Sequence, residues 1–240
     1  MDLWVGYAIP SSLPSPLWQT TKPKGQTKGR IRMHACSCTA RHTTRRVVLT
    51  GGPGAGKTAI LEFMRLAFCR HVVILPEAAG LLFGGGFPRN QSPVRLRAVQ
   101  RAIFHVQREL EESTSGDNAA IVVCDRGTPD GAAYWPGPGT LWDAVGTTAE
   151  EELGRYGAVI HLRTPSDANG YNFRNPLRTE TVEQALEIDE TIGRIWSRHP
   201  GYVEVAAAED FLVKAREALE ILRGEVPTCC RDSVSPSFVV

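Results

Sequence analysis

Short apolar runs alternate with longer amphipathic segments through the middle of the chain. Five short runs are predicted to be strands, and they lie at 47–49, 72–75, 119–124, 158–162 and 202–205. The run 119–124 is apolar throughout, which is typical of a strand buried on both faces of a parallel sheet. Between the five runs, apolar residues recur every three or four positions, which predicts helices at 57–70, 93–112, 141–145, 148–155, 181–198 and 209–223. Strands separated by helices pair in parallel through right-handed crossovers. The pattern therefore predicts a three-layer α/β sandwich.

Local signals mark where some of these elements begin and end. Ser92 followed by Pro93 is typical of a helix N-terminus, with proline in the first turn. Thr181 and Gln184 have the spacing of a capping box. Three consecutive glycines in the stretch 80–90 predict a flexible loop there.

The pattern divides the chain into one domain at 45–224 and two tails. Residues 1–44 mix Pro, Ser, Thr, Gly and basic residues without periodicity, which predicts a disordered tail. A transit peptide, or an annotated start placed too early, would also fit, since Met33 lies shortly before the first strand. Residues 225–240 are predicted to form a C-terminal tail. No apolar run reaches the roughly 18–20 residues of a membrane-spanning helix.

Composition adds a charge asymmetry to this picture. Residues 1–46 contain eight Lys or Arg and one acid, Asp2, whereas the rest of the chain contains 19 bases and 25 acids. A mildly acidic body is a poor candidate for binding nucleic acid, which requires clustered positive charge. The basic tail would suit an acidic partner.

The cysteines lack the spacing typical of a zinc site, so a metal site is the alternative to reduced thiols and not the expectation. They are Cys36, Cys38, Cys69, Cys124, Cys229 and Cys230, and they include no CxxC pair and no Cys/His spacing that suits zinc. We interpret them as reduced thiols of a cytoplasmic protein, two of them packed as small core residues.

One segment dominates the functional interpretation. It lies between the first strand and the first helix, and its sequence is Gly51-Gly52-Pro53-Gly54-Ala55-Gly56-Lys57-Thr58. This run satisfies G-x-x-x-x-G-K-[ST], in which backbone amides and the helix N-terminus cradle phosphate oxygens. Lys57 adds a full positive charge, and the Thr58 hydroxyl can bind Mg²⁺. The segment predicts binding of a nucleoside triphosphate with Mg²⁺, with ATP as the expectation and GTP as the alternative.

Three further candidates follow neighbouring strands at the carboxyl edge of the predicted sheet, where ligands bind in this class of fold. Asp125 can hold Mg²⁺ or polarise an attacking hydroxyl, and Arg126 can reach a transferred phosphate. Glu77 can bind a substrate hydroxyl or act as a general base. The structural alternatives are an acidic strand end, a solvated arginine and an exposed loop glutamate.

The stretch 163–178 is rich in Arg, Asn, Gly and Pro. Arg174 and Arg178 within it could close over the phosphates and stabilise the charge that develops during transfer. Surface arginines would have the same appearance in a sequence.

Several of these residues together resemble a known family. The run 47–58, Glu77-Ala78-Ala79, Asp125-Arg126-Gly127-Thr128-Pro129-Asp130 and Ala133-Tyr134 look like the NadR/TRPL-translocation-defect type of AAA-labelled P-loop ATPase domain. The stretch from Asn175 to Thr181 is similar to the N-x-x-R-x-E segment of that family. The likeness covers residues 45–224.

The resemblance implies a P-loop NTPase sandwich close to nucleoside and nucleotide kinases, with a parallel sheet in the order 2-3-1-4-5. It also implies that residues 51–58 bind nucleotide phosphates, that Asp125 is the metal or acceptor acid, that Glu77 faces the acceptor and that Arg178 is a lid arginine. The family contains ribosylnicotinamide kinases and nucleotide-dependent regulators. Two hypotheses follow: a Mg²⁺-dependent phosphotransferase that acts on a small nucleoside-like or hydroxylated acceptor, and a nucleotide-gated binding protein without such an acceptor.

Overall fold

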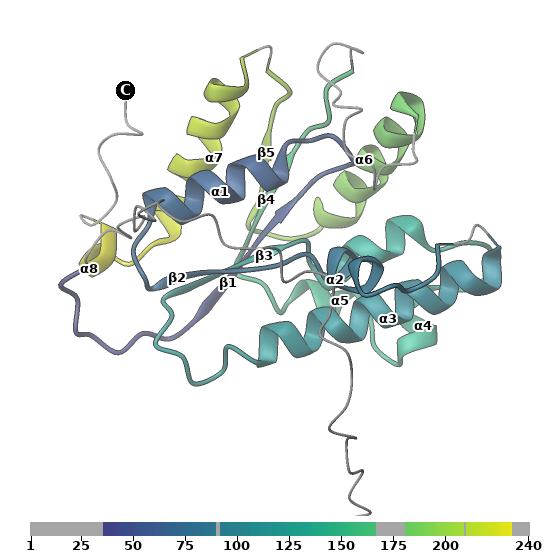
Figure 1. The fold of residues 1–240 in the computed structure, drawn as a ribbon, viewed down its shortest axis with the longest axis horizontal. Helices are drawn as coiled ribbons and strands as arrows, with labels where there is room; N and C mark the ends of the chain where they lie inside the picture. The colour runs from purple at the N-terminus through teal and green to yellow at the C-terminus, as the bar shows by residue number, and fades with distance from the viewer. Residues whose placement is uncertain (1–35, 90–91, 167–180, 209, 232–240) are drawn as a thin grey trace, which may run out of the picture. The chain divides into compact units, whose positions relative to one another are not determined.

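The computed structural model describes residues 36–89, 92–166, 181–208 and 210–231, and five strands within them form a single parallel sheet. The strand order is β2-β3-β1-β4-β5, as predicted. Figure 1 shows this sheet, whose strands are β1 (Arg45–Thr50), β2 (Val72–Leu75), β3 (Ile121–Asp125), β4 (Ala158–Leu162) and β5 (Tyr202–Val205).

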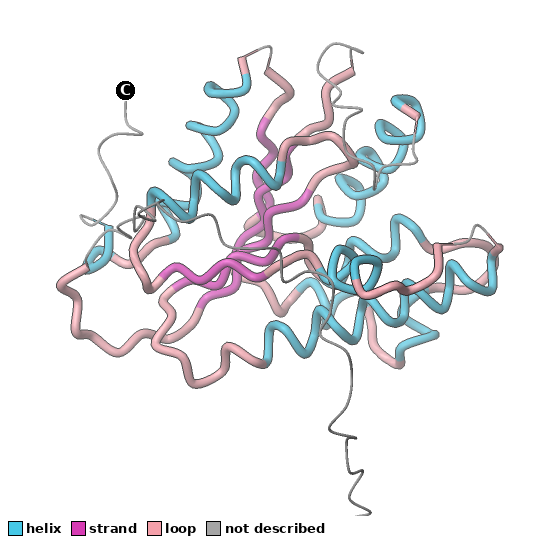
Figure 2. Tube along the Cα trace, viewed as in Figure 1, coloured by secondary structure: helices cyan, strands magenta, loops and turns pink. Residues whose placement is uncertain are grey.

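Helices cover both faces of the sheet, which gives the three layers (Figure 2). One face is covered by α1 (Lys57–Ala67) and α7 (Phe211–Glu225). The other is covered mainly by α3 (Pro93–Glu112), the 3₁₀ helix η1 (Thr128–Tyr134) and α6 (Val182–Trp196). The remaining short helices are α2 (Ala78–Gly84), α4 (Leu141–Val145), α5 (Ala149–Leu153) and α8 (Thr228–Arg231).

Alternation along the strands divides the apolar core into two layers. Leu49 points into the layer that contains Met64 of α1 and Leu222 of α7. Its neighbour Val48 points to the opposite layer, where it packs with Trp196 of α6. Successive residues of a strand face opposite sides of a sheet, so a strand buried on both faces must be apolar throughout. This explains why the predicted strand at 119–124 is an uninterrupted apolar run.

The predicted helix starts at Thr181 and Pro93 are confirmed. The Gln184 amide donates to Thr181 Oγ1 at 3.3 Å, and the Thr181 amide donates to Gln184 Oε1 at 2.9 Å. Pro93 is the first residue of α3, where its missing N–H costs nothing.

The start of the predicted 80–90 loop is helical instead. Helix α2 begins after Glu77 and continues to Gly84. Alanines and leucines precede the glycine run, and these residues favour a helix strongly enough to form about two turns before the glycines end it.

The ordered domain also extends beyond both predicted boundaries. Residues 36–44, assigned above to the tail, contact the loop before β3. Thr44 Oγ1 donates to the Ala119 carbonyl at 2.9 Å, and the His42 amide donates to Asn118 Oδ1 at 2.9 Å. After α7, α8 buries Cys230 in the core. Residues 1–35 and 232–240 lie outside the described part of the chain, so the tail prediction stays untested there.

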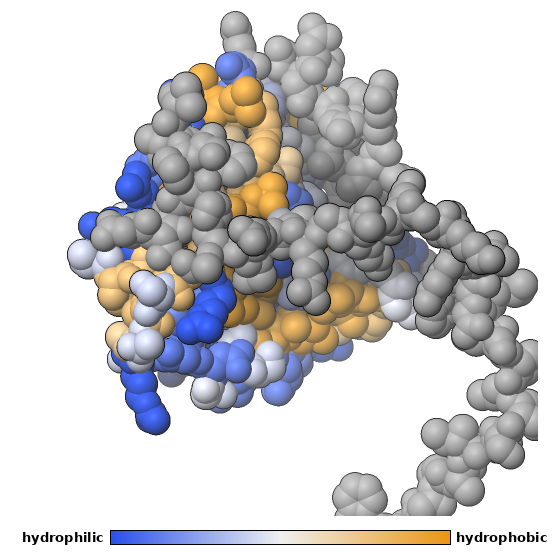
Figure 3. All heavy atoms as spheres, turned by 60° about the vertical axis from the view of Figure 1, so that its left-hand side comes forward, coloured by the Kyte–Doolittle hydropathy of each residue, from blue (hydrophilic) through white to orange (hydrophobic). Residues whose placement is uncertain are grey.

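The surface of the described domain carries some exposed hydrophobic residues. With the left-hand side of Figure 1 turned forward, hydrophobic residues gather across the middle of the view and hydrophilic ones along its lower edge (Figure 3). The large exposed hydrophobic residues of the domain are Leu66, Leu81, Val94, Val203, Leu212 and Val213. None of the helices in the described residues has the length and apolar character needed to span a bilayer.

Two glycines provide a matched test of how the turn after β3 packs against buried aromatic rings. A Cβ atom on Gly127 would lie 2.8 Å from Trp196 Cζ2 and 3.1 Å from Tyr156 Cζ, whereas one on Gly224, near the end of α7, would meet nothing within 4 Å. We expect Gly127→Ala to lower the free energy of unfolding by about 1–3 kcal/mol because buried aromatic rings must move. Gly224→Ala should raise it by about 0.5–1 kcal/mol because alanine favours the helix. Urea denaturation of both variants measures the two changes, and equal effects would contradict this packing.

Candidate functional site

The loop of residues 51–58 has a backbone shape that requires glycine. Gly51, Gly54 and Gly56 have φ angles of 142°, 85° and 91°, a region that other residues rarely adopt. A Cβ atom on Gly52 would lie 2.6 Å from Thr164 Oγ1 and 2.8 Å from the Ala185 carbonyl oxygen. The chain therefore curls tightly between β1 and α1, and the first amides of α1, which lack carbonyl partners within the helix, open onto the same place.

The Lys57 ammonium folds back over this loop. Its Nζ donates to the carbonyl oxygens of Gly51 at 2.8 Å and Gly52 at 3.0 Å. Burial, together with the charge of Arg126, lowers the pKa of Lys57 to about 8, while Asp125 and Glu77 act in the opposite direction. The loop thus holds a positive charge through two neutral carbonyls, which an anionic ligand can replace as a stronger partner.

Asp125 ends β3 and lies beside the loop, because Leu49 of β1 pairs in register with it. Burial and the charge of Glu77 raise the pKa of Asp125 to about 6. Within the described part of the chain, its Oδ1 is buried without a hydrogen-bond partner. Hard divalent cations take oxygen ligands, and Thr58 at the start of α1 offers an exposed hydroxyl. These two residues fit a Mg²⁺ site.

Glu77 and Arg126 form an ion pair at the same edge of the sheet. Arg126 Nε donates to Glu77 Oε1 at 2.8 Å, and its Nη1 donates to Asp130 Oδ1 at 3.2 Å. Burial acts to raise the pKa of Glu77, but the charges of Arg126 and Lys57 lower it below its usual value. In the structure the Arg126 guanidinium contacts two carboxylates, so its predicted role toward a transferred phosphate stays a prediction.

Asp130, the second acidic residue of the stretch 125–130, has a structural role. Its carboxylate accepts hydrogen bonds from the Gly127 amide at 3.0 Å, from Trp196 Nε1 at 3.1 Å and from the Thr50 hydroxyl. The side chain is buried. It fixes the turn after β3 against β1 and α6, and through Arg126 it positions Glu77.

Two buried charged residues contact the backbone of the loop, one from α6 and one from α7. The sequence analysis did not assign either of them to the site. Asp189 of α6 accepts from the Gly52 amide at 2.7 Å and pairs with Arg163 Nε at 3.2 Å. Lys214 of α7 donates to the Ala55 carbonyl at 2.9 Å and to the Arg163 carbonyl at 2.5 Å. The sequence contains a signal for both residues, because each is a charged residue on the buried face of an amphipathic helix.

The sequence analysis assigns two arginines to a lid over the phosphates. Arg174 and Arg178 lie outside the described residues, so the lid stays a prediction. Arg163, at the start of the same stretch, pairs with Asp189 and with Glu204, the latter at 3.7 Å.

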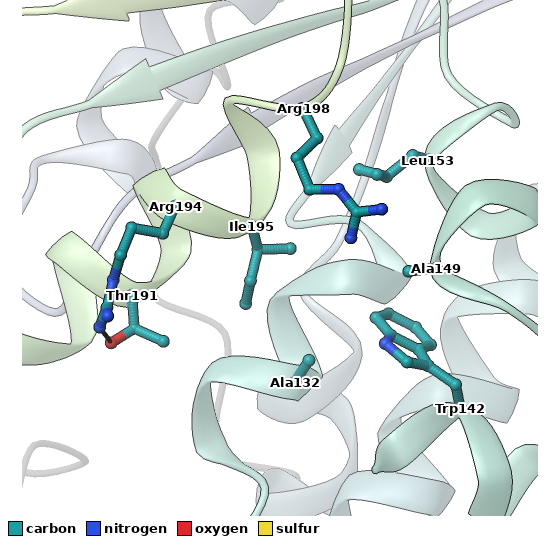
Figure 4. A pocket seen from close by; sticks show the side chains of 8 residues that line it. All are labelled: Ala132, Trp142, Ala149, Leu153, Thr191, Arg194, Ile195 and Arg198. Carbon is teal, nitrogen blue, oxygen red and sulfur yellow. Dashed lines mark hydrogen bonds between the residues drawn. The ribbon is translucent and has the colours of Figure 1, made fainter.

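A hollow of about 310 Å³ lies elsewhere, between η1, α4, α5 and α6 (Figure 4). Arg198 at its rim pairs with Glu150, and Arg194 donates to Thr191 Oγ1 at 2.8 Å. None of the predicted site residues within the described ranges lines it, so it is separate from the loop site. The lining residues are Ala132, Trp142, Ala149, Leu153, Thr191, Arg194, Ile195 and Arg198.

Comparisons with known proteins agree with the fold. A family model described as an AAA domain matches residues 46–211. No match to the chain is found among curated proteins. Among solved structures, the crystal structure of NadR protein in complex with NR is similar with a TM-score of 0.59 and 16% identity, over 78% of this chain and 52% of that chain. This chain therefore spans about half the length of that protein. Shikimate kinase from Acinetobacter baumannii in complex with shikimate gives a TM-score of 0.44 and 20% identity, over 75% of this chain and 92% of that chain.

The pH dependence of folding stability tests whether the Lys214 ammonium is buried. Burial lowers its pKa from 10.5 to about 8 in the folded protein. Between these two pH values the unfolded chain binds more protons, so folding stability rises with pH across this window. We expect the free energy of unfolding of the wild type, relative to Lys214→Met, to increase by up to about 3 kcal/mol between pH 8 and 10.5. Denaturant titrations of both proteins measure this difference, and parallel pH dependences would contradict a buried ammonium.

Proposed function

Because the chain belongs to this AAA domain family and has a P-loop kinase-like fold, we propose that it binds ATP with Mg²⁺ and transfers the γ-phosphoryl group to a small acceptor. The acceptor is a nucleoside-like or other hydroxylated molecule. The resemblance of the sequence to ribosylnicotinamide kinases supports this acceptor class.

One observation carries the proposal. The Lys57 ammonium, which donates to the carbonyls of Gly51 and Gly52, shares a single edge of the sheet with Asp125 and Glu77. A cation for the phosphates next to two carboxylates is the arrangement that moving a phosphoryl group to a hydroxyl requires. Binding of a nucleotide alone would not require the second carboxylate.

The chemistry follows from these positions. Backbone amides of the loop bind the phosphates, except that of Gly52, which donates to Asp189, and Pro53, which has no N–H. Lys57 moves from the loop carbonyls to the phosphate oxygens, where it stabilises developing negative charge. Thr58 and Asp125 would hold Mg²⁺, which when bound neutralises charge on the phosphates.

Glu77 orients the acceptor hydroxyl, since its lowered pKa keeps it ionised. The acceptor oxygen forms a bond to the γ-phosphorus as the bond from that phosphorus to the bridging oxygen breaks, and ADP leaves. The hydroxyl proton passes to the carboxylate of Glu77, which is not assigned to Mg²⁺ and which accepts the hydrogen bond of the acceptor hydroxyl.

A second candidate function is a nucleotide-gated regulatory protein that has no small acceptor. One observation favours it, namely the Arg126–Glu77 ion pair, which already engages the carboxylate assigned to the acceptor. In that case nucleotide binding would act on the stretch 163–178 rather than on a substrate.

Replacing Lys57 tests nucleotide use. We expect Lys57→Met to reduce ATP turnover by about 10²–10³-fold, because one preorganised positive charge is lost from the transition state. Arg65→Met is the matched control, because it also removes one positive charge from α1, but at a half-exposed position paired with Glu62. Steady-state turnover of ATP and GTP by both variants, with circular dichroism to confirm folding, provides the measurement. Wild-type turnover in Lys57→Met would contradict the proposal.

An acceptor screen separates the two functions. With γ-labelled ATP and a panel of nucleosides, ribosides and small polyols, we expect the label to appear in one small molecule. Glu77→Gln should lower kcat/KM for that acceptor by about 10²-fold or more, because the ionised partner of the hydroxyl is lost. Tight nucleotide binding without transfer to any member of the panel would favour the regulatory function.

A further inference from the structure

Cysteine and histidine side chains from three distant parts of the chain converge in one place. The first part precedes β1, the second is the turn between α1 and β2, and the third is α8. We call the group the cysteine–histidine cluster, and its members are Cys36, Cys38, His42, Cys69, His71 and Cys230. It involves none of the residues assigned to the loop site.

Two sets of four ligand atoms occur within the cluster, each with all its atoms within 4.8 Å of one another. In the first set, Cys36 Sγ lies 3.9 Å from Cys230 Sγ, and His71 Nδ1 lies 3.3 Å from Cys230 Sγ and 3.9 Å from Cys69 Sγ. In a tetrahedral zinc site, bond lengths near 2.3 Å to sulfur and 2.05 Å to nitrogen separate two sulfurs by about 3.8 Å and a sulfur from a nitrogen by about 3.6 Å. The observed separations agree with these to within a few tenths of an ångström.

The second set shares His71 and Cys230 with the first. It adds His42 Nε2, which lies 3.5 Å from Cys38 Sγ and 3.6 Å from Cys230 Sγ. These two separations also match sulfur and nitrogen atoms around one zinc ion. His71 and Cys230 are therefore ligands in either arrangement.

Burial argues against ordinary packing of these side chains. His71 is 4% exposed and Cys230 is 1% exposed. Cysteine is a common core residue, but a buried imidazole needs a strong polar partner. Among the described residues, His71 Nδ1 contacts two sulfur atoms, which are weak hydrogen-bonding groups. A cation between these atoms would satisfy the nitrogen and the sulfurs together.

A disulfide explains the cluster less well. Cys36 Sγ and Cys230 Sγ are 3.9 Å apart, whereas a disulfide bond measures about 2.05 Å. A disulfide would also leave the two histidines without a role. Mixed thiolate and imidazole ligands in a tetrahedral arrangement are typical of zinc.

We propose that this cluster binds one Zn²⁺ ion, with His71 and Cys230 as ligands and either Cys36 and Cys69 or Cys38 and His42 completing the four. Four protein ligands leave no open position for a substrate, so the ion is structural. It ties the segment before β1 and helix α8 to the turn that leads into β2. Since Glu77 follows the other end of β2, the ion stabilises the domain away from the site of chemistry.

The test measures metal in the full chain purified after expression with added zinc. Mass spectrometry of the metal content should find about one zinc per chain in the wild type and less than about a tenth of that in Cys230→Ser. Cys229→Ser is the matched control, since it makes the same change at an exposed neighbour outside the cluster, and it should retain the zinc. Of the double variants Cys36→Ser/Cys69→Ser and Cys38→Ser/His42→Asn, one should lose zinc and the other keep it.

A second measurement on the wild type covers the case in which Cys230→Ser does not fold. Cobalt added to the zinc-free chain should give visible absorption and a thiolate-to-cobalt charge-transfer band, and removal of zinc by a chelator should lower Tm. Three results would overturn the proposal: no zinc and no cobalt band in the folded wild type, zinc retained by folded Cys230→Ser, or a disulfide in the cluster in place of the metal. None of them depends on nucleotide turnover, so the proposed function is tested separately.

Discussion

The backbone of Gly51 and Gly52 lies against β4 and α6 so closely that no side chain fits, and the Gly52 amide donates to the buried carboxylate of Asp189 at 2.7 Å. This contact sets the curvature of the loop. With the curvature set, the carbonyls of the two glycines face the start of α1, where they hold the Lys57 ammonium. The parallel pairing of β1 and β3 then places Asp125 beside that ammonium.

Several ionisable groups near this loop are buried, and burial makes their charged forms less favourable. The pKa of Lys57 and that of Lys214 are each lowered to about 8, and that of Asp125 is raised to about 6. Each ionised group is therefore less stable here than in water. A ligand that carries phosphate charge, with Mg²⁺ beside Asp125, would compensate both signs of charge. Binding of such a ligand would therefore stabilise these charged groups. Shifted pKa values of this kind are characteristic of functional sites.

Much of the fold could be predicted from the sequence, because strand and helix periodicity and capping residues act locally. The loop of 51–58 was also predictable, since its chemistry lies in eight consecutive residues. The partners of Asp189 and the engagement of Arg126 by two carboxylates were not, because they depend on side chains that only the folded sheet brings together. The cysteine–histidine cluster is the extreme case, with Cys36 and Cys230 separated by 194 positions. Spacing rules for zinc ligands recognise local pairs and cannot detect such a set.

The most direct measurement is a crystal structure of the full chain with Mg²⁺ and a non-hydrolysable ATP analogue. We predict that the triphosphate lies in the loop of residues 51–58 and that Lys57 Nζ has left the carbonyls of Gly51 and Gly52 for a phosphate oxygen. A nucleotide bound elsewhere, with the Lys57 ammonium still on both carbonyls, would contradict the account.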